Sequence, residues 1–520
     1  MRWRGLASCG LAAVVAAAAC TPHPKPAAPQ GPPPQARLAA ANDLLAEGCL
    51  DCFLEAFAAF DALRAVPAVS AIATEGAIRA ALLAAVRERE LGLLDAPSLA
   101  RARDLVNAAP AFEPGYGPYF DVIESLPARW TPNGAAVTDD AALAAVQRAY
   151  KNRDAWLALL GGRAADDPLS AYLWLAFNCA APTGGIKPGD VPRWLAATGD
   201  RAGTPLLKFK ASTCGSYDGA ALTAIERAEP RFVEIDYFLA FTATRAGKLD
   251  EAAALLQKAY AWRPRWPAVT LQMASVYLTA EEFEASHDFY ARTLAMVPAF
   301  PDALLGDVKA LTYAGRQEEA IAVADRLLAL ERWYVGDARY WRALNETQLA
   351  RYDAAWSDIE LANTLLLNAQ VPKLAGIIAY RRHEVDVSRQ KFELSRTRNP
   401  NDCETGFYLQ LVDAEQARWP ETAGIAAAAA ACFDDEEEGL TQQIADLRAR
   451  PMDEQKRQRQ IAKREKRIAD NARMRVTSWY NAAVANYNLR HATEARQFAE
   501  RVTGDEEFGE RARDLLSRIR

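Results

Sequence analysis

Histidine is scarce in this chain of 520 residues, which holds only His23, His287, His383 and His491, all far apart in the sequence. A protein zinc site needs three or four ligands, usually at short spacings, so neither a metal nor another cofactor is predicted. The chain also lacks a Walker A loop and the GxGxxG, HExxH and GxSxG patterns. Because these patterns mark phosphate, dinucleotide, zinc-protease and serine-hydrolase sites, we predict no catalytic residues and a protein that is not an enzyme.

A strong net charge is missing as well. The 61 Lys and Arg residues and 67 Asp and Glu residues give a formal charge of -6 at pH 7. Domains that bind nucleic acid usually present a clearly basic surface. We therefore predict no nucleic-acid partner.

Long apolar runs are confined to the N-terminus. Residues 6–19 form an apolar stretch behind Arg2 and Arg4. This stretch is too short to span a bilayer as a mature helix, and it fits the basic and apolar regions of a secretory signal peptide. We predict a cleaved signal peptide over residues 1–19.

The end of this stretch, Ala17 to Cys20, resembles the lipobox of bacterial lipoproteins, in which the cysteine is acylated and becomes the first residue. That family usually has Leu where this chain has Ala17, so ordinary signal-peptide cleavage is the alternative. The resemblance implies a periplasmic protein of the bacterial cell envelope, held by a lipid on Cys20, and Thr21 in place of Asp implies sorting to the outer membrane. Residues 20–36 include seven prolines and predict an extended tether.

Six further cysteines, an even number, are compatible with disulfide bonds in an oxidising compartment. Two of them form a CxxC motif, for which we predict a local disulfide. A redox-active CxxC belongs in a βαβ context, whereas the residues around this one have helical periodicity. The six cysteines are Cys49, Cys52, Cys179, Cys214, Cys403 and Cys432.

A period of 34 residues organises the second half of the chain. Pro264, Pro298 and Pro400 lie on one 34-residue lattice, and apolar, small and turn residues recur in phase with it. Two consecutive units, 233–266 and 267–300, carry the pattern most fully. In the first unit it consists of Leu239, Ala240, Gly247, Leu249, Ala252, Leu256, Ala259 and Pro264, and in the second of Met273, Ala274, Glu281, Phe283, Ser286, Tyr290, Thr293 and Pro298.

This pattern resembles the tetratricopeptide repeat (TPR), in which each unit is a pair of antiparallel helices. The resemblance implies an all-α fold, a right-handed superhelical solenoid with an extended concave surface. We assign the TPR array to 201–434 and a TPR-like helix pair to 476–520. A one-residue slip precedes the unit at Tyr352, and the register returns at Val385. Asp307 and Arg332 depart from the pattern and are expected to loosen the ends of their unit.

Two other regions surround the array. Residues 37–200 are predicted to be irregular, helical and only degenerately repeat-like. Residues 435–475 are assigned as a charged helical insertion, in which the acidic run at 434–438 is followed by a strongly basic stretch from 451 onward, and we predict one long exposed helix there. This helix is either an arm for an acidic partner, anionic lipid or cell-wall polymer, or a solvated helix balanced by the acidic run.

The TPR resemblance also implies candidate sites. Cys403 lies near the start of one helical hairpin and Cys432 near its end, so we predict that a disulfide joins them. Family members bind peptides through first-helix positions two, five, nine and twelve, although the lysine and asparagine clamp of the chaperone-binding members is not found here. The alternative is that these side chains pack against another part of the chain. The predicted partner groove consists of Tyr237, Phe241, Leu271, Leu305, Lys309, Tyr340, Leu344, Lys373, Ile377 and Tyr380.

Two functions follow from these features. The first is a lipid-anchored TPR scaffold that binds proteins in the cell envelope during secretion, pilus assembly, outer-membrane assembly or polysaccharide export. The second is a periplasmic carrier or sensor whose N-terminal helical region binds a small ligand or glycan. A pocket lined by Trp156, Trp174 and Trp194 would favour the second.

Overall fold

The structure is a computed structural model that describes residues 32–128, 130, 134–135, 137, 139–180 and 189–519. Within these ranges the regular elements are all helices and no β-strand occurs, so the predicted all-α fold is confirmed. None of these helices combines the length and apolar character needed to cross a bilayer. The predicted signal peptide, Cys20 and most of the tether lie outside the described residues.

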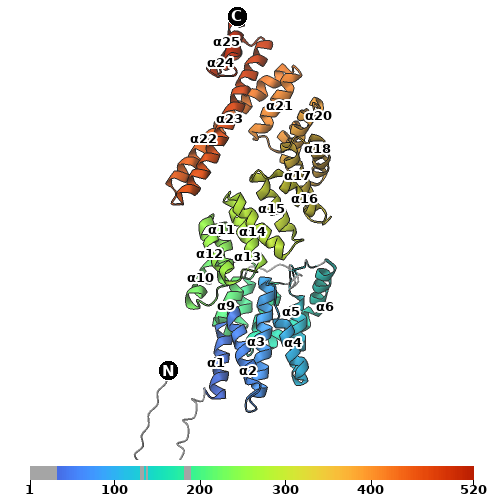
Figure 1. Ribbon diagram of the computed structural model, residues 1–520, viewed down its shortest axis with the longest axis vertical. Coiled ribbons are helices and arrows are strands. Elements are labelled where there is room, and N and C mark those ends of the chain that lie inside the picture. The colour runs from blue at the N-terminus through green and yellow to red at the C-terminus, as the bar shows by residue number, and fades with distance from the viewer. Residues whose placement is uncertain are drawn as a thin grey trace, which may run out of the picture.

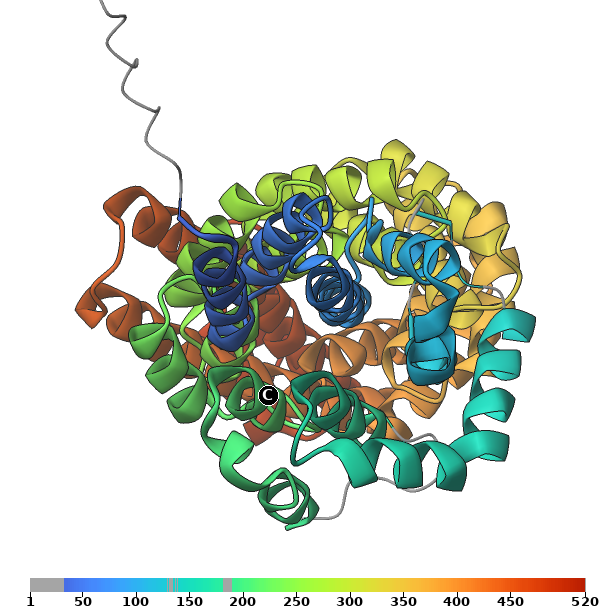
Figure 2. The same cartoon turned by 90° about the horizontal axis from the view of Figure 1, so that it is seen from below.

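The N-terminal half begins with α1, two residues before the predicted end of the tether, and contains helices of unequal length. The helix α3 (Ser70–Leu91) is rich in alanine and apolar residues on all sides and is buried along most of its length. A helix that is apolar all round requires neighbours on every side, and in Figure 2 α3 lies end-on inside the ring of the other helices. The other helices are α1 (Pro34–Glu47), α2 (Leu50–Leu63), α4 (Ser98–Ala108), η1 (Pro110–Phe112), α5 (Glu113–Ser125), α6 (Asp139–Arg163), α7 (Pro168–Cys179), α8 (Asp190–Ala196), η2 (Gly199–Gly203), α9 (Pro205–Ser212) and α10 (Gly219–Ala228).

The rest of the chain is a stack of antiparallel helix pairs that rises in sequence order along the long axis of the molecule (Figure 1). Each second helix packs against its pair partner and, up to α22, against the first helix of the next pair. The solenoid predicted from the repeat is therefore confirmed. The pairs are α11 (Ile235–Arg245) with α12 (Leu249–Trp262), α13 (Pro267–Thr279) with α14 (Phe283–Met296), α15 (Pro301–Tyr313) with α16 (Gln317–Leu328), α17 (Val335–Gln348) with α18 (Tyr352–Leu365), α19 (Gln370–Arg381) with α20 (Val385–Arg398), α21 (Cys403–Glu415) with α22 (Trp419–Ala449), and α23 (Glu454–Asn488) with α24 (Ala492–Arg501), followed by α25 (Gly509–Arg518).

The turn inside each pair explains why a turn residue recurs with the 34-residue period of the sequence. One residue there takes a left-handed conformation, and the amide of the next residue donates to the carbonyl five residues earlier, as from Lys248 to Ala243. This arrangement ends the first helix and satisfies its last carbonyls. The left-handed residue at 350 comes one position late and that at 383 is back in register, as the slip in the sequence indicated. The left-handed residues are Gly247, Glu281, Gly315, Ala350, His383, Ala417 and Arg490.

Small residues lie where the helices approach most closely. Ala240, Ala252 and Ala259 are fully buried. Ser388 occupies the position of Ala252 in a later pair, and its hydroxyl donates to the carbonyl of Gly376 at 2.9 Å. A larger side chain at these positions would overpack the helix interface, typically at a cost of about 1–3 kcal/mol.

The first helices of the pairs form the inner face of the stack. From α13 to α23, each first helix contacts the next first helix, whereas among the described residues the second helices do not contact one another to a comparable extent. In a curved stack the helices on the inside of the curve lie closer together than those on the outside. The concave surface is therefore built by α13, α15, α17, α19, α21 and α23.

Asp307 does not loosen its unit as predicted. Its side chain is only 2% exposed, and its carboxylate lies 2.6 Å from Nδ1 of His287 on the preceding helix. The other departure, Arg332, lies in the 329–334 loop between α16 and α17, which is longer than the neighbouring 297–300 and 366–369 loops.

The prediction of one long exposed helix between 434 and 475 is wrong. This segment belongs to two helices, α22 and α23, which continue the repeat helices and pack side by side as a long hairpin. Its acidic and basic runs face each other across the two helices: Arg475 pairs with Asp434 at 2.8 Å and Arg467 with Glu436 at 3.2 Å. The hairpin has its own apolar contact, formed by Ile444, Leu447 and Ile461.

Three disulfides connect the six cysteines. Cys49 is joined to Cys52, Cys179 to Cys214, and Cys403 to Cys432. The first pair lies at the start of α2, the second joins the end of α7 to the end of α9, and the third joins the start of α21 to α22. Each disulfide therefore holds the end of a helix in place or joins it to a neighbouring segment.

Candidate functional site

The inner face differs between the early and the late repeats. Tyr237 packs on Trp266 with ring centroids 4.8 Å apart, and the indole N–H of Trp266 donates to the carbonyl of Leu91 at the end of α3 at 2.6 Å. The early predicted groove residues belong to the apolar core that includes α3 or contact its members. In this part of the chain the N-terminal helices cover the predicted groove. The residues concerned are Tyr237, Phe241, Leu271 and Leu305.

The other six predicted groove residues are not members of this core and lie on α15, α17 and α19. Three aromatic residues that the sequence did not predict for the groove, Tyr313, Trp341 and Tyr408, belong to the same surface. Tyr313 is 56% exposed, a high value for a large aromatic residue, and its ring meets that of Trp341 at 5.5 Å. We call these nine residues the inner strip: Lys309, Tyr313, Tyr340, Trp341, Leu344, Lys373, Ile377, Tyr380 and Tyr408.

The two lysines of the inner strip have different surroundings. The Lys373 ammonium lies 3.0 Å from Asp402 and 3.0 Å from Glu404. Burial lowers the pKa of Lys373, but the two carboxylates outweigh it and raise the pKa above its ordinary value. Lys309 lies 5.9 Å from the centre of the Trp341 ring and has no ion-pair partner within the described part of the chain. Lys309 is therefore the cation of the strip that is open to a partner.

The tyrosines of the inner strip stay neutral at physiological pH. Burial raises the pKa of Tyr313, Tyr340, Tyr380 and Tyr408 above the ordinary value. Neutral phenols offer an apolar ring together with a hydrogen-bond donor. The strip thus combines aromatic surface, hydroxyl groups and one unpaired cation, and it contains no Ser, Cys or His that could act as a nucleophile or base.

A cavity of about 750 Å³ lies between α4, α5 and α6. Trp156 and Phe120 contribute to its wall. The Arg103 guanidinium lies over the Phe120 ring, 4.7 Å from the ring centre. Trp174 and Trp194 do not line this cavity, so it is not the three-tryptophan pocket that would favour a ligand carrier. Trp174 instead approaches Gly161, on α6.

The His287–Asp307 pair borders a second cavity, of about 450 Å³, between α14 and α16. A carboxylate that orients a histidine is one part of several catalytic sites. The cavity wall here consists of alanine, leucine and valine side chains with Glu319 and Arg326, and it includes no Ser, Thr or Cys. The geometry fits a buried polar contact within the repeat. Nor do the described residues contain a group of His, Cys, Asp and Glu side chains able to hold a metal ion.

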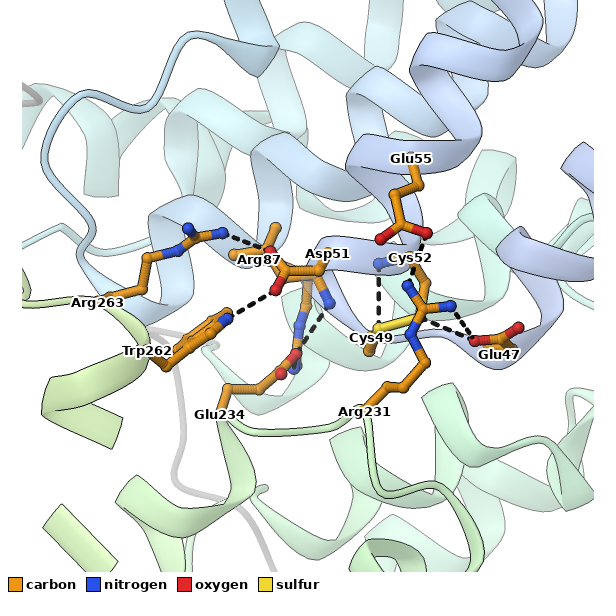
Figure 3. The surroundings of a disulfide bond; sticks show 11 residues. Glu47, Cys49, Asp51, Cys52, Glu55, Arg87, Arg231, Glu234, Trp262 and Arg263 are labelled. Carbon is orange, nitrogen blue, oxygen red and sulfur yellow. Dashed lines mark hydrogen bonds and ion pairs between the residues drawn. A yellow bond between two sulfur atoms is a disulfide. The ribbon is translucent and has the colours of Figure 1, made fainter. Parts of the chain in front are cut away.

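The CxxC disulfide lies at the junction between the N-terminal helices and the first repeat (Figure 3). Cys49 and Cys52 are both fully buried, whereas thiol–disulfide exchange requires an accessible sulfur. Ion pairs and hydrogen bonds surround it, among them the pair of Arg231 with Glu47 at 2.8 Å and the bond from the Trp262 indole to Asp51 at 2.7 Å. The disulfide thus stabilises a structural junction.

Known proteins resemble this chain only in part. No model of a protein family matches the sequence. A stretch of 120 residues, 23% of this chain, is 27% identical to the cellulose synthase operon protein C of Pseudomonas fluorescens (strain SBW25) but spans only 9% of that protein. Among solved structures, PilF of Pseudomonas aeruginosa covers 38% of this chain and 89% of its own at 16% identity and a TM-score of 0.35. The Cut9 and Hcn1 assembly of the APC/C covers 94% of this chain and 90% of its own at 11% identity and a TM-score of 0.38.

Proposed function

We propose that this chain is a repeat scaffold of the bacterial cell envelope that binds a segment of a partner protein along the inner strip. The observation that carries the proposal is the exposure of Tyr313 and the unpaired Lys309 on the inner face of a solenoid whose early inner surface is covered by the N-terminal helices. A binding surface of this kind buries aromatic anchors of the protein or its partner and surrounds them with polar contacts. The partner segment fits best if it presents apolar side chains together with a carboxylate for Lys309.

The envelope location is part of the same proposal. The three disulfides are typical of an oxidising compartment, and the N-terminal sequence resembles a lipoprotein signal ending at Cys20. The tether of residues 20–36 would then separate the helical body from the outer membrane. Among the pathways considered, the partial match to the cellulose synthase operon protein C supports polysaccharide export over secretion or pilus and outer-membrane assembly.

The binding proposal is tested by affinity purification of the full chain from detergent-solubilised membranes, with quantitative mass spectrometry of the proteins that accompany it. Tyr313→Ala and Lys309→Glu should each reduce the main partner at least tenfold, because each removes a contact of the inner strip. The matched control is Tyr150→Ala, a 68% exposed tyrosine on α6 outside the strip. Equal recovery from all three variants would contradict the proposal.

The anchor is tested separately. In a bacterial host that carries out lipoprotein maturation, metabolic labelling with an alkyne fatty acid should modify the wild-type chain and not Cys20→Ala. The Cys20→Ala protein should then move from the membrane to the soluble periplasmic fraction. Labelling of both proteins, or of neither, would contradict anchoring through Cys20.

A further inference from the structure

The first turns of α23 reach back across the solenoid to the early repeats. Lys456 pairs with Asp250 at 2.6 Å and with Glu282 at 3.1 Å, although Asp250 is 206 residues away in the chain. Two turns further along α23, Lys463 donates to the backbone carbonyl of Glu281 at 2.8 Å. In Figure 1 the free end of the α22–α23 hairpin points towards α11 and α12. The hairpin therefore bridges the two ends of the repeat array.

The acceptors of these contacts are placed at the turns between paired helices. Glu281 is the left-handed residue of its turn, with φ of 60°, and Arg464 approaches its carboxylate at 3.3 Å. At the matching position the other six turns carry glycine, alanine, histidine or arginine, so Glu281 alone is acidic. The acidic residue stands at the turn that faces the basic end of α23.

Charges hold this contact, with little apolar burial. The apolar cluster of the hairpin contains residues of α22 and α23 and of the loop between them, but none of the repeats it reaches. The core around α3 and the early repeats contains no residue of the hairpin. Besides the ion pairs, the contact includes Lys463 over the ring of Phe283 at 4.4 Å. Ion pairs between such partly exposed side chains are weakened by salt.

The hairpin is built to amplify a small movement at its base. The base is packed against α21 and α24, while the contact with the early repeats lies near the opposite end of α23. With 35 residues, α23 is about 52 Å long at 1.5 Å per residue. A rotation of about 15° at the base, of the size seen in domain movements, would displace the far end by roughly 13 Å.

We propose that the Lys456, Lys463 and Arg464 contacts are an electrostatic latch that holds the superhelix closed and controls access to the inner strip. Phe283, which lies under Lys463, stacks on Tyr313 at 5.1 Å, so the latch covers the end of the aromatic row that continues into the strip. Opening the latch exposes this end to a partner. The link to partner access rests on the proposed function, whereas the latch itself is testable without any partner.

The test measures a distance in the full chain with no partner present. Spin labels are attached to a ketone-bearing amino acid introduced at Arg245 and Arg450, two exposed positions at the end of α11 and in the α22–α23 loop, so that the native cysteines stay unchanged. In the latch variant Lys456→Glu, Lys463→Glu and Arg464→Glu, the distance distribution should broaden and lengthen by roughly 10 Å or more. Raising NaCl from 0.05 M to 1 M should have the same effect on the wild type.

Two further variants make the test specific. Reversing Asp250, Glu281 and Glu282 to Lys in the latch variant should restore the wild-type distance. Reversing Arg459, Lys466 and Arg473 to Glu changes the charge equally and should leave the distance unchanged, because these three exposed cations of α23 form no ion pair with the early repeats in the described part of the chain. An unchanged distance in the latch variant, a failed restoration, or an equal shift in this control would each overturn the latch. Loss of partner binding by Tyr313→Ala is a separate readout, so the two proposals fail independently.

Discussion

The early and late parts of the molecule bury their apolar side chains differently. From Leu38 to Ala338 the buried residues form one connected core, with α3 inside it. Beyond it the buried residues divide into separate small clusters, one around α17–α19 and another around α20 and α21. A repeat stack becomes a single packed body where other helices fill its interior and remains a series of neighbouring units where they do not. Most of the inner strip lies on the units left unfilled, α17 to α21, whereas Lys309 and Tyr313 lie on α15 at the edge of the connected core.

Buried charge follows the same division. Arg87 and Glu234, both almost fully buried, form an ion pair at 2.6 Å between α3 and the first repeat, and Glu234 also accepts from the amide of Leu50 at 3.0 Å. Arg87 lies 3.9 Å from the centre of the Phe209 ring and donates to Tyr172. In the late repeats the buried carboxylates of Asp358 and Asp413 pair with partly exposed arginines. The early network joins distant segments, whereas the late pairs join neighbouring helices.

The largest effect is expected from Glu234→Ala. The substitution leaves the buried Arg87 without its carboxylate and α2 without an acceptor at its first amide, which should lower the free energy of unfolding by about 3–5 kcal/mol. Urea unfolding followed by tryptophan fluorescence measures the change. The control Glu318→Ala removes an exposed partner of Arg351 and should hardly move the midpoint. An equal loss of unfolding free energy in both variants would contradict the claim that the buried Arg87–Glu234 pair stabilises the early core.

Removing the Cys403–Cys432 disulfide should come next. The bond closes a loop with a sequence separation of 29, and its loss through the double change to Ser should cost about 3–4 kcal/mol. Because α21 and α22 belong to the part of the chain with separate clusters, hydrogen exchange should accelerate there and stay unchanged in α3. Faster exchange in α3 would indicate that the late repeats are coupled to the early core.

Two glycines in matched environments give a direct comparison of the two parts. A Cβ on Gly76 would lie 2.6 Å from the Phe60 ring, and one on Gly376 would lie 2.7 Å from the Phe392 ring. Each change to Val should cost about 1–3 kcal/mol through overpacking. Gly76→Val should increase hydrogen exchange throughout the early core, whereas Gly376→Val should affect α19, α20 and their direct neighbours. The reverse pattern would contradict the division.

Features of the fold and of the candidate site could be predicted from the sequence where they depend on residues that lie close together along the chain. The repeat pairs and their turns follow from local spacing, as Gly247 and Ala252 illustrate, and were predicted. The bond from Trp266 to Leu91 of α3, the Arg87–Glu234 pair and the return of Lys456 to Asp250 join segments 147 or more residues apart. No local pattern encodes such contacts. The exposure of Tyr313 was missed because it lies one position beyond the twelfth position of its helix, outside the expected groove pattern.

The smallest predicted effect concerns pH and the late repeats. Burial and, to a smaller extent, the neighbouring Asp358 carboxylate together raise the pKa of Glu346 to about 7. Between its unfolded pKa near 4.3 and about 7, the folded chain keeps a proton that the unfolded chain has lost, so this group's stabilising contribution is complete below that window and is lost as the pH rises through it. Glu346→Gln should therefore increase stability at pH 8 by roughly 1 kcal/mol, because the carboxyl is only partly buried, with almost no gain at pH 4.5. Thermal unfolding at both pH values measures this, and an equal gain at both would be inconsistent with a raised pKa.

Native-state hydrogen exchange of the full chain tests the division between the two parts most directly. The amides of α2, α3, α7 and α11–α15 should open together with one high free energy, while those of α17–α21 should open with lower values that differ from pair to pair. A single opening free energy shared by α3 and α19 would contradict the account, since it would make the early and late repeats one cooperative body.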